Sequence, residues 1–258
     1  MNQNPEGGKA PGPAAPVAVQ VALPASVPVV TYTILALTVI VYLLQLVTGN
    51  AHAPDLLTLW GAKASDMIRA GQLWRLITPV LLHASPEHII FNMYALLVFG
   101  TGLERNFGHW RFLALYLLAG FTGNVLSFLL SEGYSVGAST AIFGLVAAEG
   151  VFLYQNRGLF GRQFGRAIGN VIFVVAVNLF LGLSPAIDNW GHVGGLLGGL
   201  VFTLFAGPIW EVRQSPLASG GGPSLVLGDR REPREVITGA AVVLLIFGAL
   251  AVWGLAGR

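Results

Sequence analysis

The chain has 258 residues, of which 54% are hydrophobic and only 10% are charged. Soluble domains carry roughly 25% charged residues, so this chain could not cover the surface of a globule of its size with charge. A disordered tail, a nucleic-acid-binding protein and a typical cytosolic enzyme therefore fit the composition poorly. The mean hydropathy of +0.70 predicts an integral membrane protein that resides in the lipid bilayer.

The charge balance and the cysteine count narrow the possible partners. Fourteen basic and 12 acidic residues give a formal net charge of +2, which implies no polyanionic partner and thus no nucleic acid. The chain has no cysteine, and this excludes disulfides, thiolate zinc sites and cysteine nucleophiles together. We expect neither a cofactor nor a metal.

Seven segments are candidates for membrane-spanning helices. Residues 1–28, rich in proline, alanine and glycine, are predicted to form a disordered tail. A helical span needs about 20 mostly apolar residues, with roughly 17–25 workable. The candidates are 29–48, 88–104, 111–131, 139–155, 167–183, 190–207 and 236–256. A polar linker, 208–235, separates the first six from the last. The sequence thus predicts an all-α polytopic membrane protein, with a six-helix domain at 29–207 and an appended C-terminal seventh transmembrane helix within 236–258.

The basic residues between the spans predict the orientation. Cytoplasmic loops carry an excess of lysine and arginine. With the N-terminus in the cytoplasm, ten basic residues fall on that side and four fall outside. The external loop is then 49–87, which is too polar to span the membrane. Its Trp60 and Trp74 favour the membrane interface.

Three of the predicted spans begin with polar side chains at the same depth. The second, fourth and sixth spans all start at the outer surface in this topology. The second starts with His88 and Asn92, four residues apart and so on one helical face. Ser139 follows Gly137 at the start of the fourth span, and His192 lies at the start of the sixth. Ionisable groups inside spans are costly and point to function, so we expect these side chains to converge below the outer surface.

Small residues indicate that the fourth and sixth spans touch. They recur every three or four positions, as Gly137, Ala141, Gly144 and Ala148 in one span and Gly191, Gly195 and Gly199 in the other. Such spacing lets two membrane helices approach closely. A Ser139–His192 hydrogen bond needs this closeness, because nucleophile and base must come within about 2.6–3.2 Å.

The resulting constellation predicts acyl transfer. His192 would take the proton from Ser139, whose oxygen attacks a carbonyl carbon and forms an acyl-enzyme. The charge that develops on the carbonyl oxygen needs preorganised donors. The candidates are the side chains of His88 and Asn92 and the backbone N–H of Ser139, which is unpaired in the first turn of a helix. Phe143, one turn further on, is expected to stack on the imidazole of His192.

Other polar residues near these spans have structural interpretations. Asp188, one turn before His192, is a candidate for orienting the imidazole. We expect His83 to bond within the external loop, and Glu104 to bond at the inner end of the second span. Glu149 lies ten residues after Ser139, about 15 Å deeper at 1.5 Å per residue. We expect its carboxylate to be satisfied near the cytoplasmic end.

Jointly, these motifs resemble those of the rhomboid family of intramembrane serine proteases, over roughly residues 29–207. The residues that carry the resemblance are Trp74-Arg75, Thr78-Pro79, His83, His88, Asn92, Leu103-Glu104-Arg105, Gly108, Gly137-Ala138-Ser139, and Gly191-His192 with the paired glycines that follow. The resemblance implies a catalytic dyad of Ser139 and His192 and an oxyanion site at His88 and Asn92. It also implies cleavage of single-pass membrane proteins within or near their transmembrane segment, without a triad acid.

One residue departs from the family pattern. Thr140 follows the nucleophile, where the family motif is usually Gly-x-Ser-Gly. A β-branched residue there is expected to crowd the substrate backbone or narrow the range of accepted substrates. It removes no catalytic group.

The alternatives differ in class. A helical metalloprotease would carry H-E-x-x-H, and the stretch 83–88 has one residue too many and a proline. A transporter would be expected to show interrupted spans and inverted halves, and none is visible. A catalytically inactive rhomboid-like membrane protein that binds transmembrane helices shares the fold, but would be expected to lack the serine or the histidine. The short chain, without a transit-type N-terminus, favours a bacterial plasma membrane, with the active site facing outward.

Overall fold

The computed structural model describes residues 26–49, 55–185, 187–215 and 224–257. The tail predicted at 1–28 therefore lies outside the described residues, apart from its last three.

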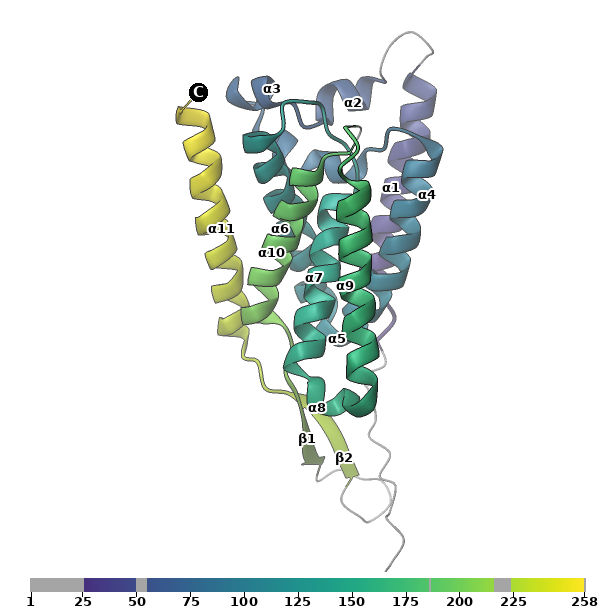
Figure 1. The fold of residues 1–258 in the computed structure, drawn as a ribbon, viewed down its shortest axis with the longest axis vertical. Coiled ribbons are helices and arrows are strands. Elements are labelled where there is room, and N and C mark those ends of the chain that lie inside the picture. Colours follow the sequence, from purple (N-terminus) through teal and green to yellow (C-terminus); the bar gives the residue numbers. More distant parts are fainter. Residues whose placement is uncertain (1–25, 50–54, 186, 216–223, 258) are drawn as a thin grey trace, which may run out of the picture.

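Helices dominate the described part of the chain (Figure 1). Six long helices are α1 (Val29–Thr48), α6 (His109–Leu130), α7 (Ser139–Gln155), α9 (Phe164–Leu181), α10 (Asn189–Ala206) and α11 (Pro233–Ala256). Another helical run consists of α4 (Pro86–Ala95), the π-helical segment η3 (Leu96–Gly100) and α5 (Thr101–Phe107). Each predicted span coincides with one of these helices to within three residues at either end. The predicted fold class, an all-α polytopic membrane protein, is confirmed.

Four helical stretches in the described part are long and apolar enough to cross a membrane by length and composition. They are Val29–Thr48, His109–Leu130, Arg157–Leu181 and Pro233–Ala256. The crossings by α4–α5, α7 and α10, and hence the number of seven spans, stay a prediction.

The two ends of the bundle differ (Figure 1). One end, which we call the α2–α3 end, carries α2 (Leu56–Gly61), α3 (Ser65–Arg69) and the 3₁₀ turns η1 (Leu73–Leu76) and η2 (Thr78–Leu81). The opposite end, the hairpin end, carries α8 (Arg157–Phe160), η4 (Gly161–Gln163) and the two strands. Helices α4, α7 and α10 all begin at the α2–α3 end, so their first turns lie at one level.

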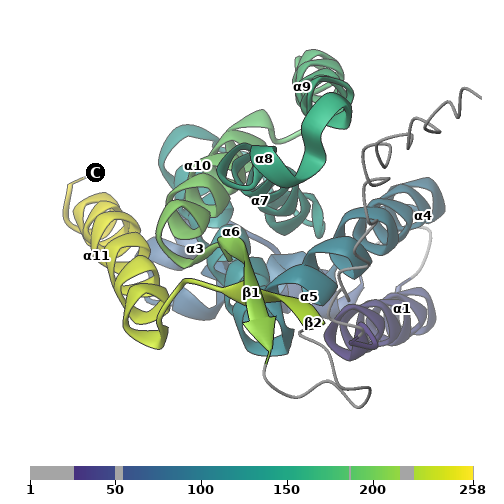
Figure 2. The same ribbon diagram turned by 90° about the horizontal axis from the view of Figure 1, so that it is seen from below.

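Helix α7 is the centre of the bundle, packed against α6, α9 and α10 (Figure 2). None of its residues from 139 to 153 is exposed. A Cβ built on Gly195 of α10 would lie 1.9 Å from the carbonyl oxygen of Thr140, and one on Gly199 would lie 2.2 Å from that of Gly144. Only glycine permits such backbone contact. The glycine spacing therefore fixes the start of α10 against the start of α7.

Helix α9 stands at the edge of the bundle (Figure 2). Val171 is its one buried residue in the described part of the chain, and it faces α7. Since most of α9 makes no buried contact, little apolar packing holds this helix to its neighbours.

An antiparallel hairpin occupies part of the region predicted as a polar linker. Strand β1 (Trp210–Ser215) pairs with β2 (Ser224–Asp229), with Trp210 opposite Asp229. The Gly- and Ser-rich composition belongs to the segment between the strands, whereas the strands contain valine, leucine and tryptophan, which suit a ladder.

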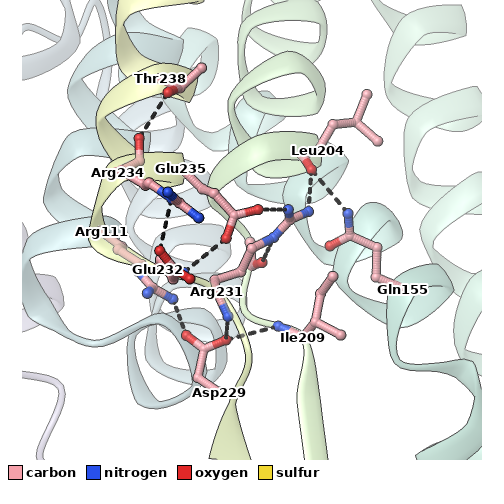
Figure 3. A network of polar contacts seen from close by, with 11 residues as sticks. Arg111, Gln155, Leu204, Ile209, Asp229, Arg231, Glu232, Arg234, Glu235 and Thr238 are labelled. Carbon is pink, nitrogen blue, oxygen red and sulfur yellow. Dashed lines mark hydrogen bonds and ion pairs between the residues drawn. The ribbon is translucent and has the colours of Figure 1, made fainter.

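A polar network fixes the hairpin and α11 to the bundle (Figure 3). The carboxylate of Asp229 pairs with Arg111 and accepts the backbone N–H groups of Ile209 and Arg231 at 3.1 and 2.9 Å. Arg231 donates to the carbonyl of Gly207 at 3.1 Å and pairs with Glu235 at 2.7 Å. The end of α10 and the first turn of α11 are thus held by one arginine, whose charge also complements the C-terminal end of α10.

Candidate active site

The first turns of α4, α7 and α10 enclose a cavity of about 720 Å³. Its walls include residues of α9 and of the segment before α7. Five sequence-predicted side chains line it, namely His88, Asn92, Ser139, Phe143 and His192. The structure therefore brings together side chains that are up to 104 positions apart in the chain.

Ser139 and His192 are in hydrogen-bond contact. The Oγ of Ser139 lies 3.0 Å from Nε2 of His192, which is within the range that a nucleophile and its base need. Ser139 is the first residue of α7. Gly137, two residues earlier, has φ of +131°, and a Cβ on it would lie 2.7 Å from Nε2 of His88. Glycine is therefore required there both for the backbone turn and for the space that His88 occupies.

The imidazole of His192 is held by an aromatic ring. Phe143 stacks on it with ring centroids 4.1 Å apart and an angle of 12° between the planes. Nδ1 of His192 is buried and has no hydrogen-bond partner among the described residues. Asp188 instead caps α10: it accepts the N–H of Gly191 at 3.1 Å and the hydroxyl of Ser127. Asp188, which the sequence suggested as a residue that orients His192, thus caps the N-terminus of α10.

The two candidate oxyanion residues present donors beside the serine. Nδ1 of His88 accepts the N–H of Ala84 at 3.4 Å, and in a neutral imidazole the proton then resides on Nε2, the atom next to Gly137. The amide nitrogen of Asn92 donates to the carbonyl of His88 at 2.8 Å. One N–H of that amide remains for another acceptor.

His83 supports the turn that precedes the serine. Its Nε2 accepts the backbone N–H of Ala138 at 3.4 Å. Burial lowers the pKa of His83 to about 3, so the imidazole is neutral near pH 7 and can act as an acceptor. A second contact to the same turn is the N–H of Gly137, which donates to the carbonyl of Pro79 at 2.9 Å.

Lys63 supports the segment before Ser139, and sequence reasoning missed this role. Its side chain is fully buried, and Nζ donates to the carbonyls of Ser131 and Gly133 at 2.6 and 2.8 Å. Its backbone pairs with that of Ser135 in both directions, at 2.9 and 3.1 Å. In the sequence, Lys63 counted only as one of four outer positive charges. Its partners are backbone carbonyls, and a sequence does not show which carbonyl a side chain will bind. The one signal in the sequence was a lysine that directly follows the apolar stretch Trp60-Gly61-Ala62.

Replacing Lys63 by methionine is expected to destabilise the protein. Two carbonyls at the end of α6 would lose their donor, and an unsatisfied buried polar group costs about 1–3 kcal/mol. Thermal unfolding of the detergent-purified variant should therefore begin at a lower temperature than that of the wild type. Arg162→Met, at an exposed position, is the matched control. An equal Tm for the two variants would contradict the role assigned to Lys63.

The side chain of Thr140 packs into the contact between α6 and α10. It is buried, and a Cβ on Gly123 or Gly191 would lie 2.6 or 3.0 Å from its side-chain atoms. The absence of a side chain at both glycines makes room for the β-branch. The narrowing of substrate range by Thr140 stays a prediction.

Comparisons with known proteins show which family the chain resembles. A family model described as Rhomboid domain matches residues 70–209, more than half of the chain. Rhomboid protease GluP of Bacillus subtilis (strain 168) is 41% identical over 173 residues, which are 67% of this chain and 34% of that protein. RHOMBOID-like protein 6, mitochondrial, of Arabidopsis thaliana is 40% identical over 150 residues, covering 56% of this chain and 48% of its own length. The chain thus spans about a third to a half of these relatives.

The bundle of long apolar helices is that of an integral multi-pass membrane protein. It contains a serine and a histidine in contact at its centre. Within the class of multi-pass membrane proteins, the chain belongs to the rhomboid family.

Proposed function

We propose that this protein is an intramembrane serine endopeptidase that cleaves single-pass membrane proteins within or near their transmembrane segment. The observation that carries the proposal is the 3.0 Å contact between Ser139 Oγ and His192 Nε2 in a cavity that also holds His88 and Asn92. The similarity to the Bacillus subtilis relative, which is named as a rhomboid protease, supports the same activity.

The reaction proceeds through an acyl-enzyme. His192 takes the proton of Ser139 as the oxygen attacks the scissile carbonyl carbon. The negative oxygen of the tetrahedral intermediate accepts hydrogen bonds from Nε2–H of His88, the free N–H of Asn92 and the backbone N–H of Ser139. His192 then protonates the leaving amine as the C–N bond breaks. Finally, His192 deprotonates a water molecule that attacks the ester carbonyl carbon, and it returns this proton to Ser139 Oγ as the acyl C–O bond breaks and the carboxyl product leaves.

The substrate must expose a peptide bond that its helix hides. Backbone groups without a partner in lipid cost several kcal/mol each. Substrates with glycine, proline or other helix-weakening residues near the cut open at lower cost. The cavity lies among the first turns of α4, α7 and α10, so we expect the cut near the α2–α3 end of the molecule.

The orientation in the membrane is part of the proposal. Most arginines belong to the hairpin end of the fold, and lysine and arginine accumulate in cytoplasmic loops. The hairpin end and the N-terminus are therefore cytoplasmic, and the cavity faces the outer side of a bacterial plasma membrane.

Purified protein and a tagged single-span reporter provide the test. Cleavage by the wild-type protein, together with labelling of Ser139 by a fluorophosphonate, would support the proposal. A fluorophosphonate reacts with an activated serine whether or not the reporter is a good substrate. Absence of labelling would overturn the proposal and favour the inactive, helix-binding member of the family.

Removing either oxyanion donor should slow the reaction without preventing binding. Loss of one such donor costs about 10²–10³ in kcat. We expect His88→Ala and Asn92→Ala each to lower kcat by this factor with little change in KM, measured on the reporter. Tyr94→Ala, at an exposed position of the same helix, is the matched control. An equal fall in kcat for the control, or unchanged kcat in both variants, would remove the oxyanion role.

A further inference from the structure

Two carboxylates lie inside the predicted spans, and only one of them has partners among the residues that the structure describes. Glu104 accepts the N–H groups of Val30 and Thr31 at 2.8 and 2.7 Å and the hydroxyl of Thr31 at 2.6 Å, and Nδ1 of His109 lies 2.6 Å away. Glu149 of α7 is half-buried and makes no hydrogen bond or ion pair with any residue that the structure describes. The partner that was expected for it near the hairpin end is not found among the described residues.

The face of α7 that carries Glu149 is defined by its neighbours. Ile142 and Val146 lie seven and three residues before Glu149, and Leu153 lies four residues after it. Residues at these spacings share one face of a helix. Ile142 lines the cavity. Val146 and Leu153 belong to an apolar cluster with Phe99 of η3 and several residues of α9. Glu149 therefore faces the seam between the α4–η3–α5 run and α9, below the cavity.

Helix α7 packs less extensively against α9, on one side of this seam, than against α6 or α10. The cavity is bounded on one side by Phe91 and Ala95 of α4 and on the other by Asn178 and Leu181 of α9. Val171 is the one residue of α9 that is buried in the described part of the chain. A transmembrane helix that enters here and brings a peptide bond to Ser139 continues along the same face of α7. Ten residues, or about 15 Å, separate Ser139 from Glu149. The part of the substrate helix beyond the cut then lies beside Glu149.

We propose that Glu149 is a specificity-determining residue that binds a nitrogen–hydrogen donor in the membrane-embedded part of the substrate helix. The proposal rests on the proposed function. Its ligand is an amide or cationic side chain, such as glutamine or lysine, roughly ten residues beyond the cut toward the hairpin end. An ionisable group inside a span is costly when unpaired and is usually paired in a substrate path. The substrate helix provides the partner that the described residues do not.

The first experiment measures binding and does not depend on catalysis. Ser139→Ala protein in lipid nanodiscs is titrated with fluorescent single-span reporters whose N-termini lie on the cavity side. One reporter has an all-leucine lower half; others carry one glutamine, or one lysine, at successive positions eight to twelve residues beyond the intended cut. The matched protein carries Glu149→Leu in addition. Glu149→Gln separates the two ligand types, because an amide binds glutamine but does not attract lysine by charge.

A side-chain hydrogen bond between membrane helices changes an equilibrium about threefold to fifteenfold. At the best position, the glutamine reporter should therefore bind more tightly than the leucine reporter by this factor. In the Glu149→Leu protein the ratio should fall to about one, with binding of the leucine reporter unchanged. The Tm of this variant should not fall, since it loses no hydrogen bond within the described residues. Equal ratios in the two proteins, or no preference at any position, would overturn the proposal.

Cleavage of the same reporters by protein with Ser139 intact separates the two proposals. A glutamine preference in binding, with no cleavage of any reporter, would remove the protease function and keep Glu149 as a helix-recognition residue. Cleavage that is equally fast for all reporters, with equal binding, would keep the protease and remove the role of Glu149.

Discussion

Replacing Ser139 or His192 by alanine should abolish turnover of a single-span reporter. The two side chains are 3.0 Å apart. In the proposed reaction they act as one unit, so loss of either removes the nucleophilic route. In enzymes of this kind the loss in kcat is on the order of 10⁶, and a second deletion adds little. We therefore expect each single variant, and the double variant, to show the same residual rate, measured by product formation over long incubation.

Folding of these variants provides the control. Ser139→Ala removes one hydroxyl from the cavity wall, and its Tm should stay close to that of the wild type. His192→Ala also removes a ring stacked on Phe143, so a moderate fall in Tm is expected. Full activity in folded Ser139→Ala protein would eliminate the serine mechanism altogether.

The second large effect is expected at Gly195. A Cβ there would lie 1.9 Å from the carbonyl oxygen of Thr140, a backbone atom that cannot move without α7. Overpacking typically costs 1–3 kcal/mol, and about 3 or more is reasonable for a contact this short. Gly195→Ala should lower the Tm strongly and also slow fluorophosphonate labelling, because a displaced α10 carries His192 away from Ser139.

A glycine in an open position shows whether the effect is specific to the contact. Nothing lies within 4 Å of a Cβ on Gly248 of α11, and Gly to Ala in a helix generally stabilises by about 0.5–1 kcal/mol. Gly248→Ala should thus keep or raise the Tm and keep the labelling rate. Similar losses in both variants would mean that glycine spacing along α10 does not set the distance between the two helices.

The features predicted best from the sequence are those that depend on local pattern. Hydropathy located the helices to within three residues, because burial in lipid acts on every side chain of a span. The spacing of His88 and Asn92, and the short segment from Gly137 to Ser139, each lie within one turn of chain. Their meeting in one cavity required only that three helices start at one end.

The features missed depend on partners distant in the chain. Lys63 bonds to backbone carbonyls of Ser131 and Gly133. Because every residue has a backbone carbonyl, the sequence does not show which of them bind a lysine. Asp188 was a candidate for orienting His192, but a helix N-cap and the hydroxyl of Ser127 use its oxygens. Glu149 was expected to find a partner at the nearest end of the bundle. Whether a carboxylate is paired depends on side chains elsewhere in the chain, and the hydrophobic periodicity of a helix does not show where those side chains lie.

Under the proposed function, the stacking of Phe143 on His192 has an electrostatic consequence, because the active site is embedded in lipid. A buried carboxylate beside the imidazole would bring a permanent charge into a medium of low dielectric constant, at a desolvation cost of several kcal/mol. An aromatic face restrains the ring and adds no charge. In the proposed mechanism, charge separation then arises at the serine–histidine pair only while a substrate carbonyl is under attack, next to donors already in position to stabilise it.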